Sequence, residues 1–207
     1  MKFTHRRMSF SSTFLVVSSA TYGKDDIETT GKIILPQIAL EMIIRSGFND
    51  KIMCFVIKNP NTGRSIAVGV QEFSSDPASC VVPNWIMKNI GLEENDKVLV
   101  SLTSLPKCTS VVFQPCTQHF LELQNPRVIL EHSLRYVPCI TEGTILEVIF
   151  NKVPYQLKVL SVKPKRMACL YMADVITSFA RPLTDFDHHW GEEDTNETFQ
   201  GKPRSLK

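Results

Sequence analysis

Most of the chain alternates short apolar runs with turn residues, and this pattern predicts a mainly β fold. The strands predicted in the first part of the chain are residues 31–36, 51–58, 64–73, 80–83, 96–102 and 109–113. Turn residues at 59–63 separate the second of these strands from the third, so the two are expected to pair as a hairpin.

Two of the predicted strands end at a proline that leads directly into a helical pattern. After Pro36, residues 37–46 place Ile38, Met42 and Ile43 on one helical face. After Pro83, a second and shorter helix is predicted at residues 84–90.

These two strand-proline-helix units superpose without a gap. The aligned pairs are Ile34 with Val81, Leu35 with Val82, Pro36 with Pro83, Ile38 with Trp85, Ala39 with Ile86, Leu40 with Met87 and Ile43 with Ile90. A unit that occurs twice, each time followed by a strand, is typical of a pseudo-symmetric closed β structure. A duplicated barrel is therefore expected in this part of the chain.

The predicted secondary structure changes near residue 115, from mainly strands to a mixture of helix and strands. Residues 126–136 carry apolar side chains at helical spacing, and strands are predicted at 144–150, 153–162 and 167–175. The predicted domains are a mainly β part at 1–115, a smaller α+β part at 116–184 and a tail at 185–207. The tail is too poor in apolar residues to offset the entropy cost of ordering, so we expect it to be disordered.

The composition predicts a globular chain with no nucleic-acid partner and no membrane insertion. The 207 residues are 43% hydrophobic, which is ample for a buried core. The 23 basic and 21 acidic residues leave a net charge of only +2, and no long Lys/Arg block occurs that would neutralise several phosphates. No stretch approaches the roughly 20 apolar residues needed to span a bilayer.

The N-terminus imitates a secretory signal peptide only poorly. Lys2, Arg6 and Arg7 precede the apolar residues 14–17, but this run is short and follows interrupting polar residues. We therefore do not expect secretion.

The six cysteines are scattered among apolar neighbours, and no Cys-x-x-Cys pair occurs. This distribution is typical of reduced thiols in a cytosolic or nuclear protein, and it favours neither a disulfide framework nor a zinc site. Neither a metal ion nor another cofactor is predicted.

The motifs of common catalytic sites are missing from the sequence, including Gly-x-Ser-x-Gly, His-Glu-x-x-His and Gly-x-Gly-x-x-Gly. Cys116 and His119 form a conceivable nucleophile pair, but such pairs meet through the fold, so their closeness in sequence is no support. A loop thiol and a surface imidazole are the plainer interpretation, and no catalytic residue is predicted. His188 and His189, with the acidic residues 192–194, are interpreted as a solvated tail and not as a metal site.

Two large aromatic residues, Trp85 and Phe120, allow two interpretations of their structural role. Each is either part of an exposed recognition surface or part of the core. Burial statistics favour the core for such residues, and the sequence alone leaves both interpretations open.

An ordered series of segments resembles the ubiquitin fusion degradation protein 1 family over about residues 31–183. The segments are Gly31-Lys-Ile-Ile-Leu-Pro36, Val82-Pro-Asn-Trp-Ile-Met87, Leu92-Glu-Glu94, Phe113-Gln-Pro115, Phe120-Leu-Glu-Leu-Gln-Asn-Pro126 and Val128-Ile-Leu-Glu-His-Ser-Leu-Arg135. The resemblance implies a double-psi β-barrel subdomain followed by a smaller α+β subdomain. This expectation agrees with the duplicated unit and with the change from a mainly β to an α+β pattern near residue 115.

The same resemblance implies a non-catalytic adaptor. Proteins of this family pair with the nuclear protein localisation 4 homologue, bind polyubiquitin, and deliver ubiquitylated substrates to the hexameric AAA unfoldase called valosin-containing protein for proteasomal degradation. A cytoplasmic and nuclear location, including the cytosolic face of the endoplasmic reticulum, is implied as well. No ubiquitin-contacting residue is carried over position by position.

The tail contains a candidate unfoldase-binding motif. Family members use the pattern Phe-x-Gly-x-Gly-x-x-Leu, and Phe199-Gln-Gly-Lys-Pro-Arg-Ser-Leu206 keeps Phe199, Gly201 and Leu206 at the matching spacing, with Pro203 in place of the second Gly. Two apolar anchors separated by a permissive glycine suit an extended segment that docks into separate pockets. The tail is shorter than is usual in the family, so pairing with the partner subunit is less secure than the fold.

Two alternative functions stay open at this point. One is a barrel module that binds the unfoldase but does not recognise ubiquitin. The other is a hydrolase that depends on Cys116 and His119.

Overall fold

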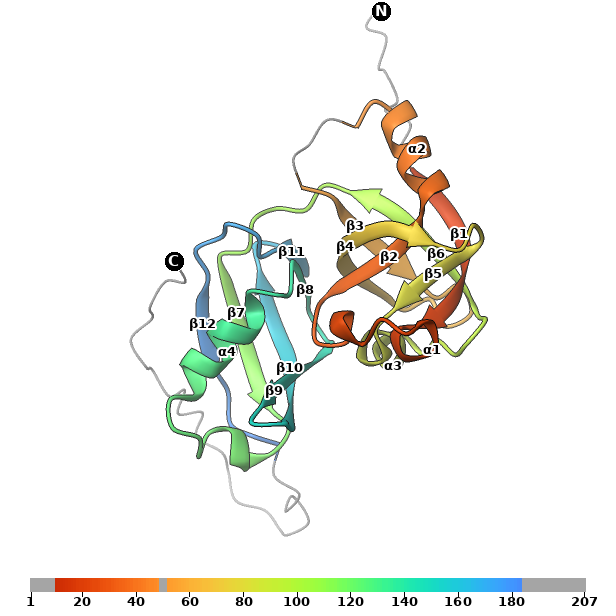
Figure 1. Cartoon of the computed structure of the whole chain (residues 1–207). Coiled ribbons are helices and arrows are strands. Elements are labelled where there is room, and N and C mark those ends of the chain that lie inside the picture. The colour runs from red at the N-terminus through yellow and green to blue at the C-terminus, as the bar shows by residue number, and fades with distance from the viewer. Residues whose placement is uncertain (1–9, 49–51, 184–207) are drawn as a thin grey trace, which may run out of the picture. The chain divides into compact units, whose positions relative to one another are not determined.

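The computed structural model describes residues 10–48 and 52–183, which divide into two compact units (Figure 1). The first unit comprises residues 1–105 together with 137–139, and the second comprises residues 106–136 and 140–207.

The first unit is a closed β-barrel with the strand order β1-β5-β2-β4-β3-β6. The strands are β1 (Ser11–Ser18), β2 (Lys32–Pro36), β3 (Cys54–Lys58), β4 (Ser65–Ser75), β5 (Ser79–Val82) and β6 (Lys97–Thr103). β1 pairs in parallel with β5, and β2 in parallel with β4. β3 pairs antiparallel with β4, which is the hairpin that the sequence predicts around residues 59–63.

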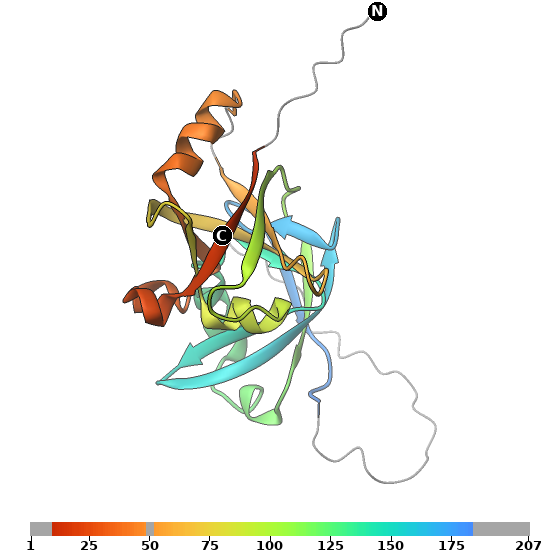
Figure 2. The same ribbon diagram turned by 90° about the vertical axis from the view of Figure 1, so that its right-hand side faces the viewer.

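Short helices stand at the two ends of this barrel. α2 (Gln37–Arg45) follows β2 at one end, and α1 (Ser19–Tyr22) and α3 (Asn84–Ile90) lie at the opposite end (Figures 1 and 2). A short 3-10 helix, η1 (Asp25–Ile27), follows α1. Both predicted strand-proline-helix units are confirmed, since Pro36 and Pro83 are the N-cap residues of α2 and α3.

The second unit is built on a sheet with the strand order β12-β7-β10-β9, and α4 (Pro126–Leu134) lies across one face of it (Figure 1). The strands are β7 (Ser110–Pro115), β9 (Ile145–Phe150), β10 (Val153–Lys163) and β12 (Ile176–Phe179). β8 (Cys139–Thr141) and β11 (Met167–Cys169) form a separate two-stranded sheet, and the 3-10 helix η2 (Gln118–Phe120) follows β7.

The sequence analysis missed the first strand of the barrel. The apolar residues 14–17, which imitate part of a signal peptide, lie within β1. Phe14 and Val16 are buried and alternate with more exposed neighbours, because β1 pairs with β5 on one side and with β6 on the other.

The strand predicted at 167–175 is wrong beyond Cys169. The chain turns there, with the backbone N–H of Ala173 donating to the carbonyl of Leu170 at 3.2 Å, and it returns to the sheet only at Ile176. Met172 adopts a φ of +50°, which is uncommon for a residue with a side chain, and no local sequence signal marks it. β8 was missed as well, because three residues carry too short a pattern.

The predicted fold class is confirmed at the coarse level of a mainly β structure with several helices. Double-psi connectivity stays a prediction. The two units divide at Leu105, and β7, which the sequence analysis assigns to the first domain, pairs with β10 and β12 of the second unit. The three-part division stays a prediction as a whole, because the tail at 185–207 lies outside the described residues.

The cysteines behave as core residues. None of the six, all of which lie within the described residues, forms a disulfide; five of them are buried, and Cys116 is half-buried. No helix among the described residues has the length and apolar character that crossing a membrane requires.

Candidate functional site

Helix α2 carries apolar side chains that the barrel does not cover. Ala39 and Ile43 face the barrel and are buried. Ile38, Met42 and Ile44 are 46%, 41% and 65% exposed. Because successive helical residues are about 100° apart, Ile38 and Met42 flank the buried stripe on one side and Ile44 lies on the other. We call these three exposed side chains the α2 surface.

The remaining strip of α2 is polar and carries Gln37, Glu41 and Arg45. The carboxylate of Glu41 and the guanidinium of Arg45 are 3.8 Å apart, one helical turn from each other, and both are exposed. Such a pair contributes little to stability. A helix that is apolar around most of its circumference, but buries only one stripe, has apolar area left for a partner.

Hydrogen bonds within its own last turn close the C-terminal end of α2. The backbone N–H of Ser46 donates to the carbonyls of Met42 at 3.0 Å and Ile43 at 3.1 Å, and the Ser46 hydroxyl donates to Ile43 at 2.7 Å. Gly47 then ends the helix with a φ of +74°. Because the helix is closed at this end and Ala39 and Ile43 are buried against the barrel, the α2 surface is pre-organised, which lowers the entropy cost of binding.

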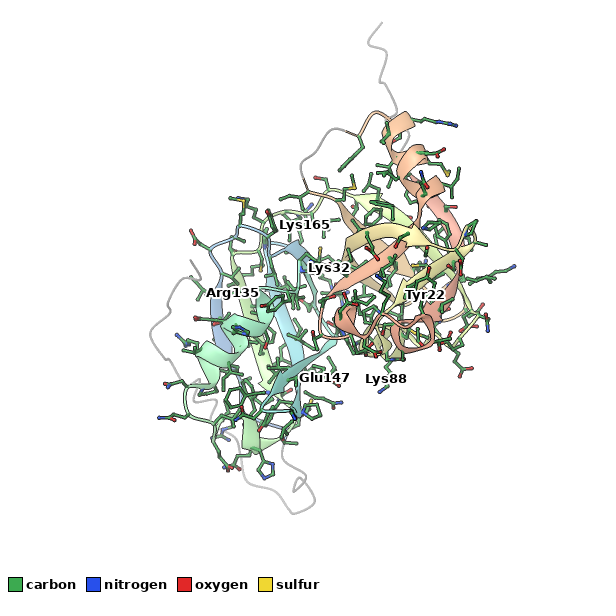
Figure 3. The ribbon with its side chains drawn as sticks, viewed as in Figure 1. Tyr22, Lys32, Lys88, Arg135, Glu147 and Lys165 are labelled. Atoms are coloured by element: carbon green, nitrogen blue, oxygen red, sulfur yellow. The ribbon has the colours of Figure 1, made fainter. Side chains whose placement is uncertain are left out.

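The opposite end of the barrel carries a polar cluster that contributes to structure. An oxygen of Glu28 accepts hydrogen bonds from the backbone N–H of Asn84 at 2.9 Å and from the hydroxyl of Ser19. The first of these bonds satisfies an N–H in the first turn of α3 that has no partner within the helix. Lys88 of α3 is exposed and points outward from this end of the barrel (Figure 3).

Glu94 belongs to the same end of the barrel. Its carboxylate accepts bonds from the backbone N–H of Ser18 at 3.0 Å and from the hydroxyl of Thr21 at 2.8 Å. Burial by itself would raise the pKa of Glu94, but these hydrogen bonds outweigh it and hold that pKa below its ordinary value. Glu94 therefore stays ionised near neutral pH and is poorly suited to act as a general acid there.

The structure gives no support to Cys116 and His119 as a catalytic pair. Within the described ranges no hydrogen bond joins the two side chains, and His119 is exposed. Burial raises the pKa of the Cys116 thiol, with only a partial offset from the neighbouring Lys158. A nucleophilic cysteine needs the opposite shift, because the thiolate is the reactive form.

Both aromatic residues that the sequence left open are buried. Trp85 is 9% exposed, and its indole N–H donates to the carbonyl of Thr30 at 3.1 Å. Phe120 is 1% exposed and packs against the rings of Tyr155 and Phe179 at centroid distances of 5.6 and 5.8 Å. These aromatic residues are core residues.

The predicted tail sites cannot be compared with this geometry. Phe199, Gly201 and Leu206 lie outside the described residues, as do His188 and His189. In the part of the chain that the structure covers, no group of three His, Cys, Asp or Glu side chains is placed to hold a metal ion.

Sequence reasoning missed the α2 surface because it treated Ile38, Met42 and Ile43 as one face. Only Ile43 of the three is buried. The signal that was available is the width of the apolar arc, since Leu40 and Ile44 extend it well beyond what a single core contact needs.

Family models match both units of the chain. "Ubiquitin fusion degradation protein UFD1, N-terminal subdomain 1" matches residues 10–106, and "N-terminal subdomain 2" of the same protein matches residues 107–182.

Curated proteins are similar over the same region. The human "Ubiquitin recognition factor in ER-associated degradation protein 1" is 35% identical over 160 residues, which are 77% of this chain and 52% of the relative. The "Ubiquitin fusion degradation protein 1 homolog" of Dictyostelium discoideum is 35% identical over 160 residues, 77% of this chain and 48% of the relative. "Ubiquitin fusion degradation protein 1" of Saccharomyces cerevisiae is 31% identical over 164 residues, 77% of this chain and 45% of the relative. The chain thus spans about half the length of the curated relatives that it matches.

Proposed function

Because this chain belongs to the ubiquitin fusion degradation protein 1 family, we propose that it is a non-catalytic adaptor that binds ubiquitin chains. In this proposal the adaptor delivers ubiquitylated proteins to a hexameric AAA unfoldase of the valosin-containing-protein type for proteasomal degradation. The names of its relatives, which refer to ubiquitin recognition and to ER-associated degradation, support the degradation role.

The α2 surface is the observation that carries this proposal. A folded partner such as ubiquitin is bound through a few apolar anchors that become desolvated, with polar residues at the rim. Ile38 and Met42 supply adjacent apolar anchors, and the polar strip with Glu41 and Arg45 borders them and separates them from Ile44.

The finer parts of the proposal rest on the family resemblance. Phe199, Gly201 and Leu206 are proposed to bind the unfoldase, and the nuclear protein localisation 4 homologue is proposed as a partner subunit. The strand order and the parallel pairs β1/β5 and β2/β4 support double-psi connectivity for the barrel. Action in the cytoplasm and nucleus, including the cytosolic face of the endoplasmic reticulum, belongs to the same proposal.

A pull-down on lysine-48-linked ubiquitin chains tests the proposed function. We expect binding with a dissociation constant of tens of micromolar or tighter, a free energy of roughly 6 kcal/mol or more. Met42→Asp is expected to weaken this binding at least about tenfold, because burying a charge at an apolar contact is costly. Gln37→Asp is the matched control, since it adds the same charge to the polar strip of the same helix.

The possible outcomes separate the claims. No binding by the unaltered chain would favour a barrel module that has no ubiquitin recognition. Equal binding by the Met42→Asp and Gln37→Asp variants would remove the α2 surface from the proposal and leave the function standing.

The unfoldase contact has its own test. Phe199→Ala or Leu206→Ala is expected to abolish co-purification with the unfoldase, because each removes an apolar anchor. Gln200→Ala, at an unspecified position of the motif, should leave co-purification unchanged. Unchanged recovery with all three variants would show that the motif is accidental.

A further inference from the structure

The sheet of the second unit has an outer face, on the side opposite α4. Residues paired across neighbouring strands project to the same face of a sheet. Lys158 of β10 pairs with Ile145 of β9 and with Gln114 of β7, and Ile176 of β12 pairs with Ser110 of β7. The neighbouring residues in each strand, such as Leu157, project to the other face and are buried beneath α4.

This outer face is more apolar than a solvated sheet face. Antiparallel sheets that face water on one side usually alternate apolar residues inside with polar residues outside. Here Ile145, Ile149, Leu160 and Ile176 are 40%, 45%, 37% and 46% exposed on the outer side. Several exposed branched aliphatic side chains on one sheet face indicate an interaction surface.

The same unit has a positive charge. Residues 106–183 contain nine Lys or Arg and five Asp or Glu, which gives 9 − 5 = +4. By the strand register, two of the cations, Lys158 and Lys163, project to the outer face, and so does Glu147. An apolar face with lysines favours an occupant that is both apolar and acidic.

The chain itself contains such a segment directly after the described residues. Residues 184–197 include six Asp or Glu and no Lys or Arg, which gives 0 − 6 = −6. The same segment contains two aromatic residues, Phe186 and Trp190.

The point where this segment begins lies beside the outer face. The backbone N–H of Leu183 donates to the carbonyl of Pro115 at 2.9 Å, and Pro115 is paired with Leu157 of β10. Three strand spacings separate the two edges of the sheet, about 15 Å. Fourteen residues reach at most about 46 Å, so the segment is long enough to cross the sheet.

We propose that residues 184–197 dock within their own chain on the outer face of the β12-β7-β10-β9 sheet. Phe186 and Trp190 cover Ile145 and Leu160, which lie beside Lys158, and the carboxylates lie near Lys158 and Lys163. This contact would cover an apolar face of the second unit and hold the following residues 199–206 close to the fold. The inference is independent of the proposed function.

Trp190 provides the test, because the chain has only two tryptophans and Trp85 is buried in the first unit. The difference in acrylamide quenching between the full chain and its Trp190→Phe variant reports on Trp190 alone. We expect Trp190 to be shielded at low salt and to become more accessible as salt is added.

A pair of charge reversals tests where the segment docks. Lys158→Glu is expected to raise the quenching constant of Trp190 about threefold, the size expected for loss of an exposed charge pair. Arg135→Glu is the matched control, because Arg135 lies at the end of α4 on the other face of the sheet (Figure 3). If Lys158→Glu perturbs folding, Ile145→Asp serves in its place, because Ile145 is paired with Lys158.

Three results would overturn the proposal. The first is Trp190 quenching in the unaltered chain that equals that of a free tryptophan amide. The second is an equal effect of Lys158→Glu and Arg135→Glu, which would show attraction to the charged unit without a defined site. The third is shielding that rises with protein concentration, which would show docking on a second copy.

Discussion

Helices α2 and α3 each follow a strand that ends in proline, yet they differ in how much of their apolar surface is buried. Trp85, Ile86, Met87 and Ile90 of α3 are all buried. In α2 only Ala39 and Ile43 are buried. Ile38, which aligns with Trp85, is 46% exposed.

The difference comes from what surrounds each helix. α3 is held by residues that are distant in sequence, since Glu28 accepts from its first turn and Asn59 donates to the carbonyls of Ile90 and Gly91. The end of α2 is held by its own Ser46. One copy of the unit has thus become part of the core, and the other has kept an apolar surface that is available to a partner.

The largest expected effect comes from the aligned pair Trp85 and Ile38. Trp85→Ala should lower the free energy of unfolding by about 3–5 kcal/mol, because it leaves a cavity and removes the bond to Thr30. Ile38→Ala should change it by less than about 1 kcal/mol, because that side chain is half exposed. Urea denaturation followed by circular dichroism measures both values, and equal losses would break the contrast between the helices.

The contacts at the helix ends should show a smaller contrast. Asn59 is 1% exposed, and its amide donates to the carbonyls of Ile90 at 3.2 Å and Gly91 at 2.6 Å. Asn59→Ala should cost about 1–3 kcal/mol, since it removes both bonds that the buried amide donates and the bond that it accepts from the backbone N–H of Asn61. Ser46→Ala at the end of α2 should cost about 0.5–1 kcal/mol, because water can replace that hydroxyl. The same denaturation experiment compares them, and a larger loss from Ser46→Ala would contradict the prediction.

The smallest expected effect is a pH dependence that involves Glu94. Its pKa lies below the ordinary value of 4.5, so its bonds to Ser18 and Thr21 stabilise the fold fully above that pH. This stabilisation is lost as the pH falls from 4.5 through the lower pKa of the folded state. The stability difference between the unaltered chain and Glu94→Gln should therefore shrink as the pH is lowered from 6 to 3.

Glu41→Gln is the control for this titration. It removes a carboxylate from the exposed ion pair of α2, whose contribution to stability is small. A stability difference for Glu94→Gln that stays constant down to pH 3 would show that its bonds do not depend on the charge of the carboxylate.

The sequence predicted the periodic elements well and the irregular ones poorly. The helices after Pro36 and Pro83, the hairpin of β3 and β4, and the strands β9 and β10 were all predicted from apolar pattern and turn residues. β12 and the preceding turn were missed, because the left-handed conformation of Met172 depends on tertiary contacts such as the bond from the Lys107 ammonium to its carbonyl.

Of the candidate sites, the sequence provided the tail motif with named residues and left the folded surface unnamed. The outer sheet face was hidden because Ile145 and Ile176 belong to strands that meet only through β7 and β10. Strand order across a sheet is not written in local periodicity.

By itself, the sequence determined that a strand-proline-helix unit occurs twice and which family the chain resembles. Those properties follow from local spacing, because the period of apolar residues and the position of proline depend only on neighbours along the chain. Only the tertiary structure decided which copy is covered. The residues that enclose α3, among them Thr30 and Asn59, are about 30 or more positions from the side chains and carbonyls that they bind. No local pattern shows that such residues will cover one helix and leave its counterpart exposed.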